Sequence, residues 1–104
     1  MRIERWYVER DGPLSEVAIQ RKIEAFGFTV TSRLYPAGRL DFPSIEDQVC
    51  LAAVVRGLVK MTVDGEPTYL APGDIAFIPA GAVRSLEVIG SSAPLCLEAL
   101  PRSV

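Results

Sequence analysis

The sequence predicts an all-β fold of the jelly-roll or barrel type, with one α-helix near the N-terminus. Two observations lead to this prediction. Between residues 28 and 100, short apolar runs recur, and glycine, proline and aspartate separate them. In the first of these runs apolar and polar side chains alternate, which is the period of a strand with one buried face. At 104 residues the chain can bury one hydrophobic core, so we expect a single domain over residues 1–104.

The first part of this domain, residues 1–27, is expected to hold one strand and one helix. Segment 3–9 is rich in aromatic and β-branched residues, which favours a strand. Ser15 is a suitable N-cap for a helix over residues 16–26. Gly27 suits the left-handed position that follows a helix end. One face of the predicted helix is apolar and should pack on the rest of the domain, with the residues Ile19, Ile23 and Phe26.

The remainder, residues 28–100, is expected to form the β-barrel. Its strand candidates are the segments 28–34, 49–55, 58–63, 68–70, 75–78, 84–89 and 95–100. Segment 49–55 is apolar throughout, whereas a strand with one face in water would alternate. We therefore expect its outer face to be covered by the N-terminal helix, by a second subunit of a homodimer, or by both.

A motif of glycines and prolines lies in the second half of the barrel region. Residues 72–84 follow the pattern P-G-D-x4-P-x-G-x2-R, which ends at Arg84. This pattern resembles the second conserved motif of the cupin superfamily, in which a metal-binding histidine occupies the position of Arg84. The resemblance implies a double-stranded β-helix or jelly-roll barrel. Within the superfamily, the chain resembles small single-domain cupins with the type-2 conserved barrel.

The spacing of the first cupin motif, G-x5-H-x-H-x3-E-x6-G, also fits the chain, from Gly38 to Gly57. Ser44 and Glu46 stand at its two histidine positions, and Cys50 stands at its glutamate position. The chain contains no histidine at all. The resemblance therefore places a ligand pocket at four residues that all replace metal ligands, namely Ser44, Glu46, Cys50 and Arg84.

The residues at these four positions do not suit a metal ion. Ser44 is a poor ligand at neutral pH, and Arg84 carries a permanent positive charge. A cation beside that guanidinium would be repelled by several kcal/mol at an intermediate effective dielectric constant. Glu46 and Cys50 remain as two donors where at least three are usual. We therefore expect neither a bound metal nor another cofactor.

Three orientations of Arg84 are open from the sequence. The guanidinium can pair with Glu46 inside the barrel, because an unpaired buried charge is costly. It can donate to an anionic ligand such as a carboxylate or a phosphate. It can also turn toward the barrel mouth and solvent. No catalytic residue is assigned, since the thiol of Cys50 would need an activating base and the chain has no histidine.

Three functional hypotheses follow. The leading one is a metal-free cupin that binds a small molecule, with an anion as one option, in its barrel. The second is a cupin-type enzyme, similar to a dioxygenase, isomerase or epimerase, in which Glu46 is the base and Arg84 the electrostatic stabiliser. The third is a non-catalytic dimeric module for interaction or sensing. Of these hypotheses, the enzyme is not the favoured one.

Composition narrows the partners. The formal net charge is −2, and lysine and arginine are scattered along the chain, which argues against nucleic acid as a partner. No apolar run reaches the length that spans a membrane. The charged N-terminal segment lacks the apolar core of a signal peptide, so we expect a cytoplasmic protein.

Overall fold

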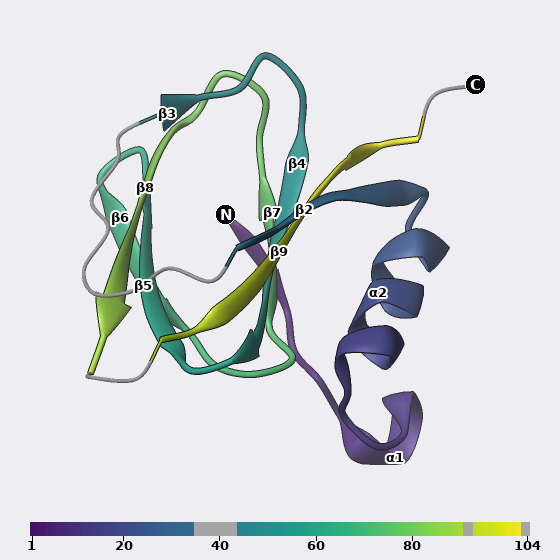
Figure 1. Cartoon of the computed structure of the whole chain (residues 1–104). Helices are drawn as coiled ribbons and strands as arrows, with labels where there is room; N and C mark the ends of the chain where they lie inside the picture. The colour runs from purple at the N-terminus through teal and green to yellow at the C-terminus, as the bar shows by residue number, and fades with distance from the viewer. Residues whose placement is uncertain (35–43, 91–92, 103–104) are drawn as a thin grey trace.

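The structure is a computed structural model that describes residues 1–34, 44–90 and 93–102. Gly38, the expected start of the first motif, lies outside these residues. Within them the chain forms two antiparallel sheets around a shared interior, and a helix packs on the outside of one sheet (Figure 1). In the described ranges no helix has both the length and the apolar character needed to cross a membrane.

The larger sheet has five strands in the order β1-β7-β4-β9-β2, with the bounds β1 (Arg2–Glu4), β7 (Ile75–Ile78), β4 (Cys50–Arg56), β9 (Leu95–Pro101) and β2 (Phe28–Leu34). The smaller sheet has the order β3-β8-β5-β6, with β3 (Ser44–Ile45), β8 (Val83–Ile89), β5 (Leu58–Val63) and β6 (Glu66–Leu70). Most spatial neighbours are distant in sequence, as in a jelly roll. The all-β prediction is confirmed, and every expected strand from residue 28 onward appears within two residues of its predicted bounds.

The core of the barrel lies between the two sheets. Inward and outward side chains alternate along β4, β5, β7 and β9, and nearly all of the inward ones are apolar. The most buried members of this core include Val54, Val59, Met61, Leu70 and Ile78, each no more than 2% exposed. The cysteines Cys50 and Cys96 belong to this same cluster and form no disulfide.

A second hydrophobic cluster explains why β4 is apolar on both faces. Helix α2 (Glu16–Ala25) begins at Ser15, whose Oγ accepts a hydrogen bond from the amide of Ala18 at 3.0 Å, and ends before Gly27 at a φ of +90°. The buried side chains of α2 pack on the outward residues of the five-stranded sheet, in a cluster of Ile19, Ile23, Leu51, Ala53, Ile75, Leu97 and Ala99. The helix therefore covers the outer face of β4, and the homodimer stays a prediction.

The expected strand over residues 3–9 is wrong beyond its first two residues. β1 ends at Glu4, and a short helix, α1 (Val8–Asp11), follows. The carboxylate of Asp11 accepts from the backbone amide of Tyr7 at 2.9 Å, and Gly12 closes the turn at a φ of +80°. These local bonds favour a helical turn over the extended chain that β-branched and aromatic residues suggest.

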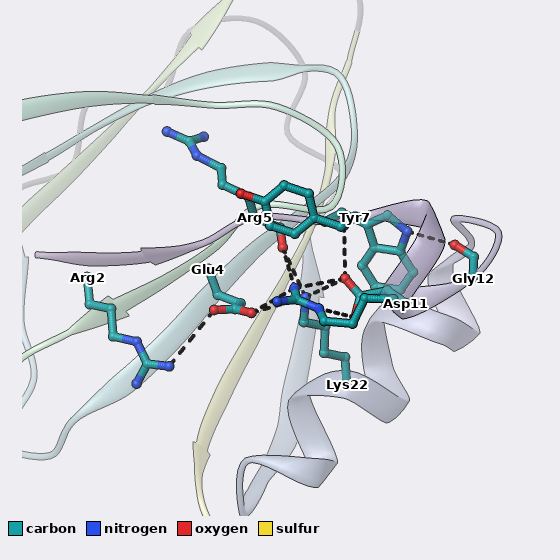
Figure 2. Close-up of polar contacts among 9 residues, drawn as sticks. Arg2, Glu4, Arg5, Tyr7, Asp11, Gly12 and Lys22 are labelled. Atoms are coloured by element: carbon teal, nitrogen blue, oxygen red, sulfur yellow. Dashed lines mark hydrogen bonds and ion pairs between the residues drawn. The ribbon is translucent and has the colours of Figure 1, made fainter.

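Asp11 is also the centre of an ion-pair network that ties the N-terminal segment to α2 (Figure 2). Its carboxylate lies 2.9 Å from Nζ of Lys22 and 3.0 Å from Nη2 of Arg10, which also bonds Glu4 at 2.9 Å. The guanidinium of Arg10 is the main reason why the pKa of Asp11 falls well below its usual range. A groove of about 460 Å³ lies beside this network, and two of the three cations that line it, Arg10 and Lys22, already have carboxylate partners.

Candidate functional site

Backbone hydrogen bonds join the second motif to the residues that follow Gly38. Ser44 of β3 is the direct register partner of Arg84 in β8. The amide of Gly81 donates to the carbonyl oxygen of Glu46 at 2.7 Å. Gly81 has a φ of +79°, a conformation that glycine adopts without strain. The pairing of β3 with β8 and the turn at Gly81 therefore bring Ser44, Glu46 and Arg84 close together.

The aspartate of the second motif has a structural role. Asp74 is 5% exposed, and its Oδ2 accepts from the amide of Ala71 at 2.8 Å, which closes the turn between β6 and β7. The same carboxylate oxygen accepts from Nη1 of Arg5. Asp74 thus fixes the turn and the N-terminal segment, and it does not face the barrel site.

Arg84 points into the barrel, so of the three orientations open from the sequence, the one toward solvent is not the one adopted. The residue is 9% exposed, in the gap between the two sheets. Its Nη1 lies 3.3 Å from Sγ of Cys50 in β4, and its Nε lies 3.4 Å from Oγ of Ser44 in β3. The guanidinium therefore bridges the sheets and touches two of the three other predicted site residues.

Among the described residues, the carboxylate nearest to Arg84 is that of Glu98 in β9, which the sequence did not predict. Oε1 of Glu98 lies 3.2 Å from Nη2 of Arg84, whereas Oε1 of Glu46 lies 3.9 Å from the same atom. The side chain of Glu46 is 45% exposed and that of Glu98 33%. The expected ion pair between Arg84 and Glu46 is thus present, but it is longer than the ion pair between Arg84 and Glu98. A signal was present, since Glu98 is the one charged residue in the apolar run 95–100.

Two cavities are lined by the Arg84–Glu98 pair. The first has a volume of about 160 Å³ and is mostly apolar, with Leu34, Ser44, Met61, Arg84, Ser85, Leu86 and Glu98 around it. The second has about 110 Å³, with Thr31, Glu46, Cys50, Arg84, Glu98, Ala99 and Leu100 around it. Each of the four predicted site residues lines at least one cavity, so the barrel offers space for a small molecule beside a buried cation.

This arrangement does not fit a metal ion. Any ion held by Ser44, Glu46 and Cys50 would lie within a few ångströms of the Arg84 guanidinium, which is 3.3–3.9 Å from each of them. At 4 Å and an effective dielectric constant of 20, that repulsion is about 4 kcal/mol for each positive charge of the ion. Among the described residues, no three cysteine, aspartate or glutamate side chains converge in a metal-binding group.

Both cysteines hold their protons more tightly than a free thiol does. Burial raises the pKa of Cys50, and the adjacent Arg84 guanidinium opposes this rise only in part. Burial raises the pKa of Cys96 to about 11, and the neighbouring Glu98 carboxylate adds to the rise. Because a thiolate is the nucleophilic form, neither cysteine is prepared for nucleophilic attack at neutral pH.

The Cys96 thiol should make stability fall at high pH. Its pKa is raised from 9.0 in the unfolded chain to about 11 in the folded one, so the folded state binds more protons between these values. The contribution of this thiol to the free energy of unfolding is complete below pH 9. It falls by about 2–3 kcal/mol as the pH rises to 11 and beyond. Urea unfolding at pH 8.5, 10 and 11 should show a steeper decline for the wild type than for Cys96→Val. Parallel declines would contradict this prediction.

No protein-family model matches the chain, and no curated protein sequence matches it. Solved structures do match. Acireductone dioxygenase from Bacillus anthracis is 12% identical with a TM-score of 0.67, over 97% of this chain and 78% of that chain. A DUF861 family protein from Thermotoga maritima is 16% identical with a TM-score of 0.61, over 97% of this chain and 98% of that chain. The cupin domain of Schizosaccharomyces pombe Cnp3 is 16% identical with a TM-score of 0.58, over 72% of this chain.

The chain spans 64% of the Cnp3 cupin domain and 65% of a conserved Streptococcus pyogenes protein of unknown function, which is 21% identical with a TM-score of 0.57. These similarities show that the chain has the cupin fold, as its glycine and proline motifs imply. Identities of this size carry no information about the ligand or the reaction of this chain.

Proposed function

We propose that this cupin-fold protein binds a small molecule in its barrel without a metal ion. The molecule carries a carboxylate group, to which the guanidinium of Arg84 donates hydrogen bonds. The observation that supports the proposal is a guanidinium that is buried yet loosely paired. Charge-assisted hydrogen bonds between a guanidinium and a carboxylate are about 2.7–2.9 Å long. Among the described residues, the two carboxylates that contact Arg84 lie 3.2 Å (Glu98) and 3.9 Å (Glu46) from its Nη2 atom. A ligand carboxylate could therefore improve on them.

The neighbourhood of Arg84 supports a molecule with a small hydrocarbon part. The 160 Å³ cavity beside the guanidinium is lined by Leu34, Met61 and Leu86 in addition to its polar residues. An engineered apolar cavity of about this volume holds a benzene molecule. Binding would bury the hydrocarbon against these side chains and set the carboxylate against Arg84, a combination typical of small-molecule pockets.

The replacement Arg84→Met tests this proposal. The wild type should bind 4-methylpentanoate saturably with a dissociation constant of about 0.1–1 mM, the range that fragment efficiencies give for about eight non-hydrogen atoms. Arg84→Met should abolish this binding. Its free energy of unfolding should fall by about 1–3 kcal/mol, because the partly exposed Glu98 loses its cationic partner while the protein stays folded. Isothermal titration calorimetry and urea unfolding measure the two quantities.

The matched control is Arg21→Met, which removes an arginine from the exposed face of α2, away from the barrel. It should bind 4-methylpentanoate as the wild type does. Loss of binding in both variants would point to net charge rather than to the pocket. Equal binding by the wild type and Arg84→Met would disprove the proposal, and so would a wild type that binds no small carboxylate saturably.

A further inference from the structure

The charges around the two barrel cavities limit what kind of carboxylate can bind there. Among the described residues that line the cavities, the charged ones are Arg84, Glu46 and Glu98. One guanidinium thus faces two carboxylates, both within 3.9 Å of its Nη2 atom. The described residues of the site therefore carry a surplus of negative charge before any ligand enters it.

A simple monoanion would worsen this balance. Its carboxylate would join Glu46 and Glu98 around a single guanidinium, and like charges at such distances disfavour one another. Glu98 would also lose part of its pairing with Arg84 in an interior where an unpaired charge is costly. A ligand that brings a positive group together with its carboxylate avoids both penalties, because each charge then keeps a partner.

We infer that the ligand is a zwitterion, an α-amino acid with a short apolar side chain. Its carboxylate would meet Arg84, its ammonium group would meet Glu98 and Glu46, and its side chain would enter the 160 Å³ cavity. This inference rests on the proposed function, because it assigns a substrate class to the same pocket. It accounts for the presence of Glu98 in an otherwise apolar strand run.

The side chain can be matched to the cavity by size. A volume of about 160 Å³ suffices for about six carbon atoms in an apolar setting. The isobutyl group of leucine is within that limit, and Leu34, Met61 and Leu86 offer it apolar contacts. L-Leucine is therefore a suitable probe, and each of its charged groups can be removed without a change in the hydrocarbon.

The experiment compares three ligands of matched shape by isothermal titration calorimetry with the full chain. They are L-leucine, 4-methylpentanoate, which lacks the ammonium group, and 3-methylbutylamine, which lacks the carboxylate. L-Leucine should bind about tenfold tighter than either of the others, the effect of one additional charge-assisted contact. A measurement in 0.5 M salt should narrow the difference only slightly, because partly buried pairs are weakly screened.

The variant Glu98→Gln should move two of the ligands in opposite directions. It should weaken L-leucine binding about tenfold, because the ammonium group loses a carboxylate. It should strengthen 4-methylpentanoate binding, because a negative charge leaves the pocket and Arg84 becomes freer to donate. The matched control Glu24→Gln removes a carboxylate from the exposed end of α2 and should change neither affinity.

The outcomes separate this inference from the proposal beneath it. If 4-methylpentanoate binds as tightly as L-leucine and Arg84→Met abolishes the binding of both, Arg84 binds a ligand carboxylate as proposed. The inference that the ligand is a zwitterion is then wrong. If 3-methylbutylamine binds tightest, the two glutamates dominate and the inference is overturned. If no carboxylate binds, the inference fails together with the proposed function.

Discussion

Replacing Gly57 by alanine is expected to lower the free energy of unfolding by about 3–5 kcal/mol. Gly57 ends the first motif and joins β4 to β5 with a φ of +93°, which costs a residue with a side chain about 1–3 kcal/mol. A Cβ atom there would also lie 2.7 Å from Cβ and 2.9 Å from Cα of Pro94. The second atom is backbone, so the clash cannot be relieved by a rotamer change and adds an overpacking cost.

Gly65→Ala is the matched control for this prediction. Gly65 joins β5 to β6 with a φ of +83°, but a Cβ atom there would have no other atom within 4 Å. Its replacement should cost only the conformational part, about 1–2 kcal/mol. Urea unfolding followed by circular dichroism gives both values. Equal losses for the two variants would show that the approach of Pro94 to Gly57 has no energetic weight.

Replacing Ile23 by alanine is expected to lower the free energy of unfolding by about 2–5 kcal/mol. Ile23 is 0% exposed and packs with Leu51 and Leu97 in the cluster between α2 and the five-stranded sheet. Alanine would remove most of the apolar contact and leave a cavity, since the helix is also fixed by Ile19 and by its N-cap. The barrel interior lies on the other face of the sheet and should keep its ligand affinity.

Val17→Ala provides the comparison on the same helix. Val17 is 57% exposed, and alanine is the better helix former, so this replacement should change stability by no more than about 0.5 kcal/mol. The same unfolding measurement applies to both variants. A loss for Ile23→Ala as small as that for Val17→Ala would mean that α2 contributes little to the fold.

The strands of the barrel were predictable because local chemistry defines them. Glycines with positive φ end most of the apolar runs, and few other residues can occupy those turns. The helix was predictable for the same reason, since Ser15 and Gly27 mark its ends. The cupin resemblance rested on these positions rather than on ligands, and it held although every metal-ligand position had changed.

Three features depended on contacts between distant segments. β3 is only two residues long, and its pairing with Val83 and Arg84 defines it. The segment from Tyr7 to Asp11 is helical because of side-chain bonds that propensities do not include. Glu98 reaches Arg84 only because β9 and β8 lie in opposite sheets that face one interior. No spacing rule in the sequence links residues 84 and 98.

The sequence by itself determined the cupin frame, the helix and the place of Arg84 at a former ligand position, because turn residues and periodicity are local properties. Only the tertiary structure decided what surrounds that arginine. The burial of Arg84, its closer contact with Glu98 than with Glu46, and the two cavities beside it follow from how the sheets close on each other. The charge of a pocket is the sum over residues from several strands, and chain folding alone brings them together.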